Sequence, residues 1–323
     1  MTTQTLPTSS ERLQSLQQNA VILTLERGIL RTRKRINSNA VQSDADPDVL
    51  HVAKDILESE QLKAIAEQDR IIGNYVKARS LPSPFKSGFY LLPVRLVSEV
   101  VDQLDQLKAE RETLVKIFLA SYERAKDNAE AGTDEIGSIF TQAKEKLGSL
   151  YNPQDYPAVE KVREKFFMTV QILELQTPGK LKAISKDLYE REVAKMESVW
   201  EDASAKIVNI LLCEFQELTS HLVDRLTPDA GGEEGKKKKA LRTSTVKNLN
   251  DWLGLFDARN LANDDSLKAL VQKARLAIAG IDAEDLREDD TLKAVVAEQF
   301  SKIKDEIDQA VIAAPQRRID FDV

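Results

Sequence analysis

The sequence feature that most constrains the fold is the stretch Leu181–Leu226, which contains neither glycine nor proline. Its apolar residues recur every three or four positions, as on one face of an α-helix. They are Leu181, Ile184, Leu188, Met196, Val199, Ala203, Ile207, Ile210, Leu218 and Leu222. An unbroken helix of this length would extend about 69 Å at 1.5 Å per residue. A compact domain rarely holds such a helix, so we expect an elongated multi-helix bundle with long antiparallel helices, or a coiled-coil stalk.

A second long helix is predicted from Pro93 to about Asn128. Its apolar face is interrupted at Arg111 and otherwise follows a helical spacing through Val100, Leu104, Leu107, Leu114 and Phe118. The composition agrees, because glycine contributes only 12 and proline only 10 of the 323 residues. The abundant Leu, Ala, Glu, Lys and Gln residues favour helices. We therefore expect a mainly α fold.

The segment least typical of a helix is Val21–Ile36, near the N-terminus. It is rich in β-branched residues, contains Gly28, and alternates at Thr32, Lys34 and Ile36. This pattern predicts a small β element, either one strand or a bent hairpin. Its natural partner is the segment Gly88–Leu92, which follows a proline-rich break in the chain.

The remaining helices are predicted from shorter periodic segments and their caps. They are Ser9 or Ser10 to Ala20, Pro47–Glu58 with Asp46 as its cap, Ser59–Ser80, Thr133–Leu150, Ala158–Gln176, Leu241–Ala258, Asp264–Ala279 with Asn263 as its cap, and Thr291–Ala313. Within Ala158–Gln176, the residues Thr169–Leu173 are also compatible with a strand, so that alternative stays open. The predicted regions are an N-terminal part with β structure (1–92), a long-helix bundle (93–226), a flexible Lys-rich loop (227–240), and a C-terminal helical subdomain with a tail (241–323).

The net charge of −7 is unevenly distributed. Residues 1–36 hold six basic and two acidic residues, whereas residues 281–323 hold six basic and twelve acidic ones. Such asymmetry either steers a partner or a neighbouring copy, or belongs to two ordinary solvated surfaces. No apolar run reaches the roughly 18–20 residues that span a bilayer, and the first residues do not resemble a secretory signal. We expect a cytoplasmic protein that does not enter a membrane.

The residues of common catalytic and metal sites are scarce. Two histidines and one cysteine exclude most His/Cys metal sites and any internal disulfide. Cys213 lies in an apolar stretch and is expected in the core. The stretch Gly231–Lys236 lacks the pattern of a phosphate-binding loop, and the acidic run Asp282–Asp290 is typical of a helix cap and a solvated surface. We predict no catalytic residue, cofactor or metal, and therefore no enzyme.

Three segments are candidates for binding a partner. The first is the basic cluster Arg27–Arg35, and within it Arg31, Arg33, Lys34 and Arg35, which either face a partner or form an ordinary solvated strand or turn. The second is Arg259 and Asn260, at a corner between two helices, which either satisfy free helix carbonyls or face a partner. The third is the C-terminal tail, in which Ile319 and Phe321 alternate with polar residues; it either adds a strand to a partner's sheet or is a frayed terminus.

Nucleic acid is the alternative partner, bound by the clusters Arg27–Arg35 and Lys236–Lys239 through its phosphates. The sequence gives this alternative little support. The pI is near 5.2, and no aromatic residue is interleaved with either cluster for base stacking.

Three segments, Gly88–Pro93, Ala240–Leu267 and Leu270–Gly280, together resemble an uncharacterised helical family of bacteria and their phages and plasmids. Its members are often encoded beside MoxR-type AAA+ ATPases and von Willebrand A-type proteins. The resemblance implies an accessory or substrate adaptor for a AAA+ machine, and carries over no functional residue. We expect a non-enzymatic helical scaffold or adaptor that binds a protein partner, such as a AAA+ ATPase, or its own copies.

Overall fold

The computed structural model describes residues 9–37, 46, 49–131, 138–176, 179–227 and 241–313. The chain forms two compact units. Unit 1 comprises Met1–Ile22, Ala78–Val97 and Ile172–Val323, and unit 2 comprises Leu23–Lys77 and Ser98–Gln171. The predicted boundaries at residues 92, 226 and 240 divide the chain consecutively, whereas each unit is assembled from separate segments. The described residues are mainly helical with a small antiparallel sheet, which confirms the mainly α class.

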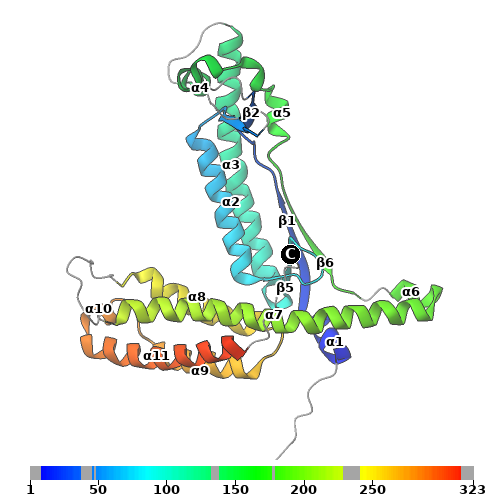
Figure 1. Ribbon diagram of the computed structural model, residues 1–323, viewed down its shortest axis with the longest axis vertical. Coiled ribbons are helices and arrows are strands. Elements are labelled where there is room, and N and C mark those ends of the chain that lie inside the picture. Colours follow the sequence, from blue (N-terminus) through cyan, green and yellow to red (C-terminus); the bar gives the residue numbers. More distant parts are fainter. Residues whose placement is uncertain are drawn as a thin grey trace, which may run out of the picture. The chain divides into compact units, whose positions relative to one another are not determined.

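Two long helices dominate unit 2. Helices α2 (Glu60–Arg79) and α3 (Val97–Glu130) run antiparallel to each other (Figure 1). One end of this pair is closed by an aromatic core that includes Phe118, Tyr122 and Tyr156. The shorter elements of this unit are η3 (Gly148–Leu150), η4 (Pro153–Asp155), α4 (Ile139–Leu147) and α5 (Val159–Arg163).

Unit 1 is built on the 41-residue helix α7 (Lys186–Leu226), and α11 (Asp290–Ala313) packs antiparallel along it (Figure 1). The buried face of α7 includes Trp200, Ile207 and Phe215, at the spacing predicted from the sequence. The predicted helix Leu181–Leu226 is interrupted once, because the Ser185 side chain accepts from the Leu188 N–H and begins α7. The other helices of the unit are α1 (Ser9–Asn19), η2 (Val94–Leu96), α6 (Gly179–Ile184), α8 (Thr243–Arg259), α9 (Asp265–Ile278) and α10 (Asp285–Glu288).

The strands form two sheets. One has the order β4-β5-β1-β6, with β4 (Leu81–Pro82), β5 (Phe89–Pro93), β1 (Ala20–Arg27) and β6 (Met168–Glu174). The other pairs β2 (Arg33–Ile36) with β3 (Val52–Asp55). The predicted β element at Val21–Ile36 is confirmed as β1 and β2, and so is the pairing of its first part with the segment at Gly88–Leu92.

Several predicted elements are wrong for identifiable reasons. The segment Pro47–Glu58 contains strand β3 because it pairs with β2, and this long-range pairing overrides local helix propensity. The segment Ala158–Gln176 is helical only in α5 and then becomes β6, so the strand alternative is confirmed. The cap of α9 is Asp264, whose Oδ1 accepts from the Leu267 N–H at 2.7 Å, while Asn263 adopts a positive φ of 55°.

Two further findings concern single residues and the membrane. Cys213 is exposed on α7, because it lies on the helix face opposite the buried Leu211 and Phe215, so its predicted core position is wrong. Among the described residues, no helix combines the length and the apolar character needed to cross a membrane.

Gly28 occupies a position in unit 2 where any side chain would force its neighbours to shift. A Cβ atom there would lie 2.4 Å from both the Lys165 carbonyl oxygen and the Phe167 ring. We predict that Gly28→Ala lowers the free energy of unfolding by about 1–3 kcal/mol, measured by urea denaturation with far-UV circular dichroism. Gly73→Ala, inside α2, is the control, and should leave stability unchanged or raise it by up to about 1 kcal/mol. Equal effects of the two changes would contradict the close approach.

Candidate functional site: an arginine-bearing β-ribbon

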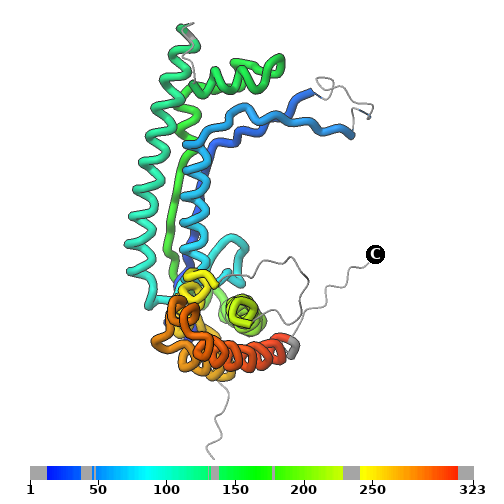
Figure 2. The backbone as a smooth tube through the Cα atoms, turned by 90° about the vertical axis from the view of Figure 1, so that its left-hand side faces the viewer, coloured from blue at the N-terminus to red at the C-terminus, as the bar shows by residue number. Residues whose placement is uncertain are grey.

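The basic cluster of the sequence lies on a two-stranded antiparallel ribbon, β2–β3, in unit 2. In Figure 2 the ribbon projects sideways from α2 and α3. The register places Lys34 opposite Lys54 and Arg33 opposite Asp55. Because successive side chains of a strand point to opposite faces, Arg33 and Arg35 share one face of the ribbon, and Lys34 shares the other face with Lys54.

The lysine face holds the ribbon against the rest of unit 2. Both lysines reach the carboxylate of Asp155, with Nζ–O distances of 3.0 Å for Lys34 and 2.6 Å for Lys54. Lys54 also donates to the Leu150 carbonyl, and the Tyr156 hydroxyl donates to the Ile56 carbonyl at 2.6 Å. Burial alone would raise the pKa of Asp155, but the hydrogen bonds from Lys54 and Lys34 outweigh it, so the pKa lies below its ordinary value.

The arginine face is open. Arg33 and Arg35 are exposed, as is Arg31 just before β2, and within the described residues none of the three forms an ion pair. The only acidic residue paired with them in the strand register is Asp55. Of the four residues predicted in this cluster, three arginines are therefore available to a partner, and Lys34 is engaged by Asp155.

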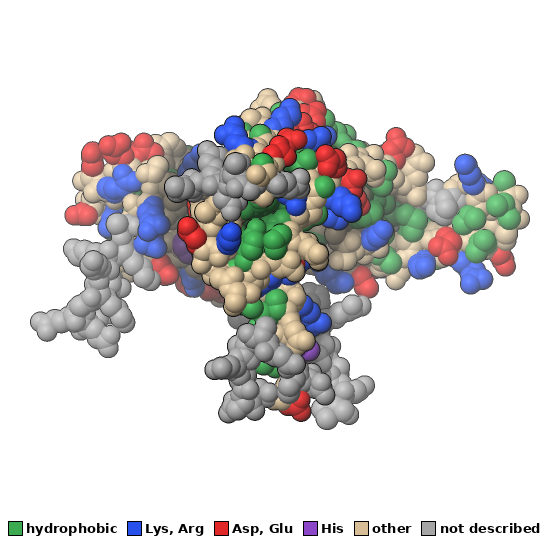
Figure 3. All heavy atoms as spheres, turned by 90° about the horizontal axis from the view of Figure 1, so that it is seen from above, with side chains coloured by type: hydrophobic (Ala, Val, Ile, Leu, Met, Phe, Trp, Pro, Cys, Tyr) green, Lys and Arg blue, Asp and Glu red, His purple; other side chains and the backbone are tan. Residues whose placement is uncertain are grey.

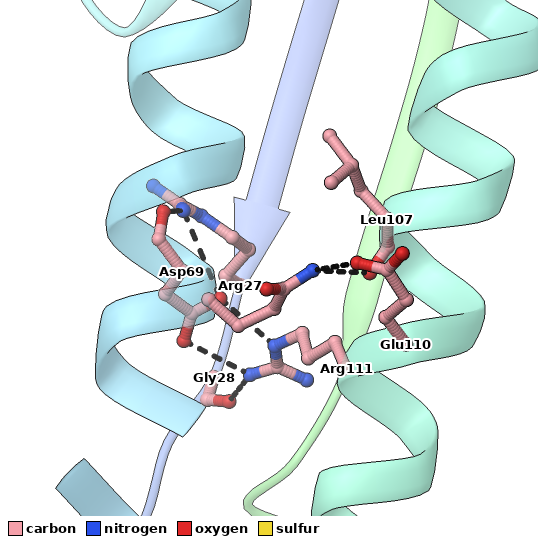
Figure 4. A network of polar contacts seen from close by, with 7 residues as sticks. Arg27, Gly28, Asp69, Leu107, Glu110 and Arg111 are labelled. Atoms are coloured by element: carbon pink, nitrogen blue, oxygen red, sulfur yellow. Dashed lines mark hydrogen bonds and ion pairs between the residues drawn. The ribbon is translucent and has the colours of Figure 1, made fainter. Parts of the chain in front are cut away.

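Arg27, at the start of the same basic cluster, serves a different purpose. Its guanidinium donates to the Asp69 carbonyl on α2 and lies 3.7 Å from the Asp69 carboxylate. The same carboxylate accepts from Arg111 Nε at 2.8 Å, and Arg111 Nη2 donates to the Gly28 carbonyl at 2.6 Å (Figure 4). Gln68 completes the network by donating to the Leu107 carbonyl and to Glu110.

Arg111 is the buried residue whose role sequence reasoning missed. Its side chain is only 2% exposed, on the α3 face that packs toward α2. The available signal was the interruption of an otherwise apolar helix face by an arginine, since a buried arginine needs a carboxylate partner. Its partner, Asp69, is 42 residues away in sequence, so spacing alone could not identify it.

Arg259 and Asn260, the second predicted site, are buried in unit 1. Both terminal nitrogens of Arg259 bind the carboxylate of Glu214, at 2.7 and 2.9 Å, and this carboxylate also accepts from the Trp252 indole at 2.8 Å. The Asn260 side chain exchanges hydrogen bonds with the backbone of Asp264. With exposed fractions of 2% and 7%, the two residues favour the structural alternative over a partner surface.

The acidic run Asp282–Asp290 caps a helix and also lies on the surface, as predicted. Residues 282–290 in unit 1, here called the acidic corner, expose Asp282, Glu284, Asp285, Glu288, Asp289 and Asp290. Asp289 accepts from the N–H groups of Thr291 and Leu292 at the start of α11. Asp282 accepts from the N–H groups of Asp285 and Glu284, which lowers its pKa. The one cation in the corner, Arg287, donates to the Leu241 carbonyl and to Thr243.

The other features singled out in the sequence form no recognisable binding or metal site among the described residues. Ile319, Phe321 and Lys236–Lys239 lie outside the described residues. His51 and His221 are both exposed. Among the residues that the structure describes, no group of histidine, cysteine and carboxylate side chains is arranged to hold a metal ion.

Comparison with known proteins adds no relative: no family model, curated protein or solved structure matches the chain.

The Arg111–Asp69 contact leads to a stability prediction. Arg111→Met leaves the Asp69 carboxylate and the Gly28 carbonyl without their main donor, and should lower the free energy of unfolding by about 3 kcal/mol. The double variant Asp69→Leu/Arg111→Met removes both charges and should recover part of this loss. Urea denaturation of the two single variants and the double variant measures the coupling, and additive losses would contradict it.

The lowered pKa of Asp155 predicts that the free energy of unfolding depends on pH. Because its pKa is lowered in the folded chain, its contribution to stability is complete above the ordinary value of 3.8 and is lost as pH falls through the lowered value. Asp155→Asn should therefore cost about 1–3 kcal/mol at neutral pH and progressively less below about pH 4. Urea denaturation from neutral to acidic pH measures this. Asp55→Asn, on the other face, should change stability by less than about 0.5 kcal/mol. A pH-independent cost of Asp155→Asn would contradict the assignment.

Proposed function

We propose that the chain is a non-enzymatic scaffold or adaptor of the cytoplasm, an elongated bundle of long antiparallel helices that binds an acidic protein surface through its arginine-bearing ribbon. The partner class is a AAA+ ATPase of the MoxR type, as the family resemblance implies, or further copies of the chain itself. The observation that carries the proposal is that neighbouring cations on β2 have different contacts. Lys34 is bound by Asp155, whereas Arg33 and Arg35 face outward on an anchored ribbon.

Arginine suits such a contact. Its planar guanidinium forms two parallel hydrogen bonds with one carboxylate, and it loses less water than a lysine ammonium on binding. The ribbon also presents the two side chains from a backbone held in place by Asp155 and Tyr156. Less conformational entropy is then lost on binding than from a free loop.

Binding to nucleic acid is a second candidate, because two-stranded ribbons enter the major groove and arginine binds phosphate. The charge distribution supports it less. The chain carries a net charge of −7. Figure 3 shows Lys and Arg side chains interspersed with Asp and Glu over much of the face it presents. Strands β2 and β3, with sequences RKRI and VAKD, also contain no aromatic residue for base stacking.

The proposal is tested by affinity capture from the native host at low and at high salt, with mass spectrometry of the captured proteins. We expect the wild-type chain to retain a AAA+ ATPase or its own copies at low salt and to release them at high salt. Arg33→Glu/Arg35→Glu should reduce the captured partner at least about tenfold, since like charges across an interface cost several kcal/mol.

A matched variant controls for the change in net charge. Arg191→Glu/Lys195→Glu reverses two exposed cations on α7 that form no ion pair among the described residues, and should retain the partner. A monomer that is insensitive to salt and retains no protein would contradict the proposed function. If the two double variants lost equal amounts of captured partner, the ribbon would not be the binding surface.

A further inference from the structure

We propose that the partner of the ribbon is the acidic corner of a second copy of this chain, so that copies associate head to tail. The inference rests on the proposed function and deepens it, because it identifies the acidic protein surface. The contact is between the arginine face of β2–β3, in unit 2 of one copy, and residues 282–290, in unit 1 of the next.

The donor side consists of Arg33 and Arg35. They lie two residues apart on one strand, so their Cα atoms are separated by about 6.5–7 Å along the ribbon. Each can bind a separate carboxylate with both terminal nitrogens. Neither has to leave an ion pair that the described residues form. Arg31 extends the same positive surface toward the base of the ribbon.

The acceptor side offers an excess of uncompensated carboxylates. Glu284, Glu288 and Asp290 are exposed and form no ion pair with another described residue. Asp282 and Asp289 are held by backbone N–H groups, so the corner keeps a defined shape. The guanidinium of Arg287 is already engaged by Leu241 and Thr243. The corner therefore keeps an excess of negative charge, because its six carboxylates outnumber its one guanidinium.

A second copy is favoured over nucleic acid because the chain itself carries both halves of the contact, and because the ribbon strands hold no aromatic residue for base stacking. Asp55 lies opposite Arg33 on the arginine face and repels any anionic partner there, so Arg35 and Arg31 are the less hindered donors. Because the donor and acceptor surfaces differ, each copy has one of each. Such a contact either closes reciprocally into a two-fold dimer or repeats into a ring or an open chain of copies.

A charge exchange tests the contact. The ribbon variant Arg33→Glu/Arg35→Glu has two negative surfaces, and the corner variant Glu284→Lys/Glu288→Lys/Asp290→Lys, in which four basic residues face three acidic ones, has two positive ones. Neither variant should associate with itself. Mixed in equal amounts, they pair the reversed ribbon with the reversed corner and the native ribbon with the native corner, so association should return. Sedimentation velocity over about a hundredfold range of concentration, at low and at high salt, measures the mass.

For the wild type we expect the mass to rise with concentration at low salt and to fall to that of one chain at high salt. Each single-surface variant should associate at least about tenfold more weakly. The control Arg191→Glu/Lys195→Glu should associate like the wild type. Far-UV circular dichroism establishes that each variant keeps its helical content.

Several results would overturn the inference. One is a wild-type mass of one chain at every concentration at low salt, even if the ribbon captures a AAA+ ATPase; that result would leave the proposed function intact. A second is a mixture of the two variants that stays monomeric. A third is a low-salt titration in which DNA or RNA binds through Arg33 and Arg35 while the chain stays monomeric, which would assign the ribbon to nucleic acid.

Discussion

The guanidinium of Arg111 is the contact on which unit 2 depends most. It joins three segments that are distant in sequence, because it lies on α3, binds Asp69 on α2 and donates to the Gly28 carbonyl at the end of β1. A buried charge of this kind is costly unless all of its partners are in place. It therefore specifies one alignment of the helices and one path for the chain that leaves β1 and enters the ribbon.

A second charge, the partly buried carboxylate of Asp155, plays a similar part nearer the ribbon. Its carboxylate holds one lysine from each strand of the ribbon, so β2 and β3 are anchored together. Tyr156 adds a hydrogen bond to the Ile56 carbonyl, and its ring packs against Phe140 and Tyr151. Arg111 fixes where the chain enters the ribbon, and Asp155 fixes which face of the ribbon turns inward.

Elements with a strong local signal were predictable from the sequence. The long helices α3 and α7 follow the periodicity of their apolar residues, and β1 follows its β-branched run. Strand β3 was not predictable, because its four residues are extended only through their pairing with β2. The basic cluster was identified as a whole. Its separation into bound Lys34 and open Arg33 and Arg35 requires the strand register and the position of Asp155, 121 residues away.

The register of the ribbon therefore decides which cations stabilise the fold and which face a partner. Side chains alternate along a strand, so a shift of one residue would turn Arg33 and Arg35 toward Asp155 and turn Lys34 away from it. The hydrogen bond from the Ile56 N–H to the Thr32 carbonyl opposes this shift at the base of the ribbon. The pairing of Lys34 and Lys54 with one carboxylate opposes it within the strands. Ion pairs that contribute to folding thus also determine the charge that the ribbon presents for binding.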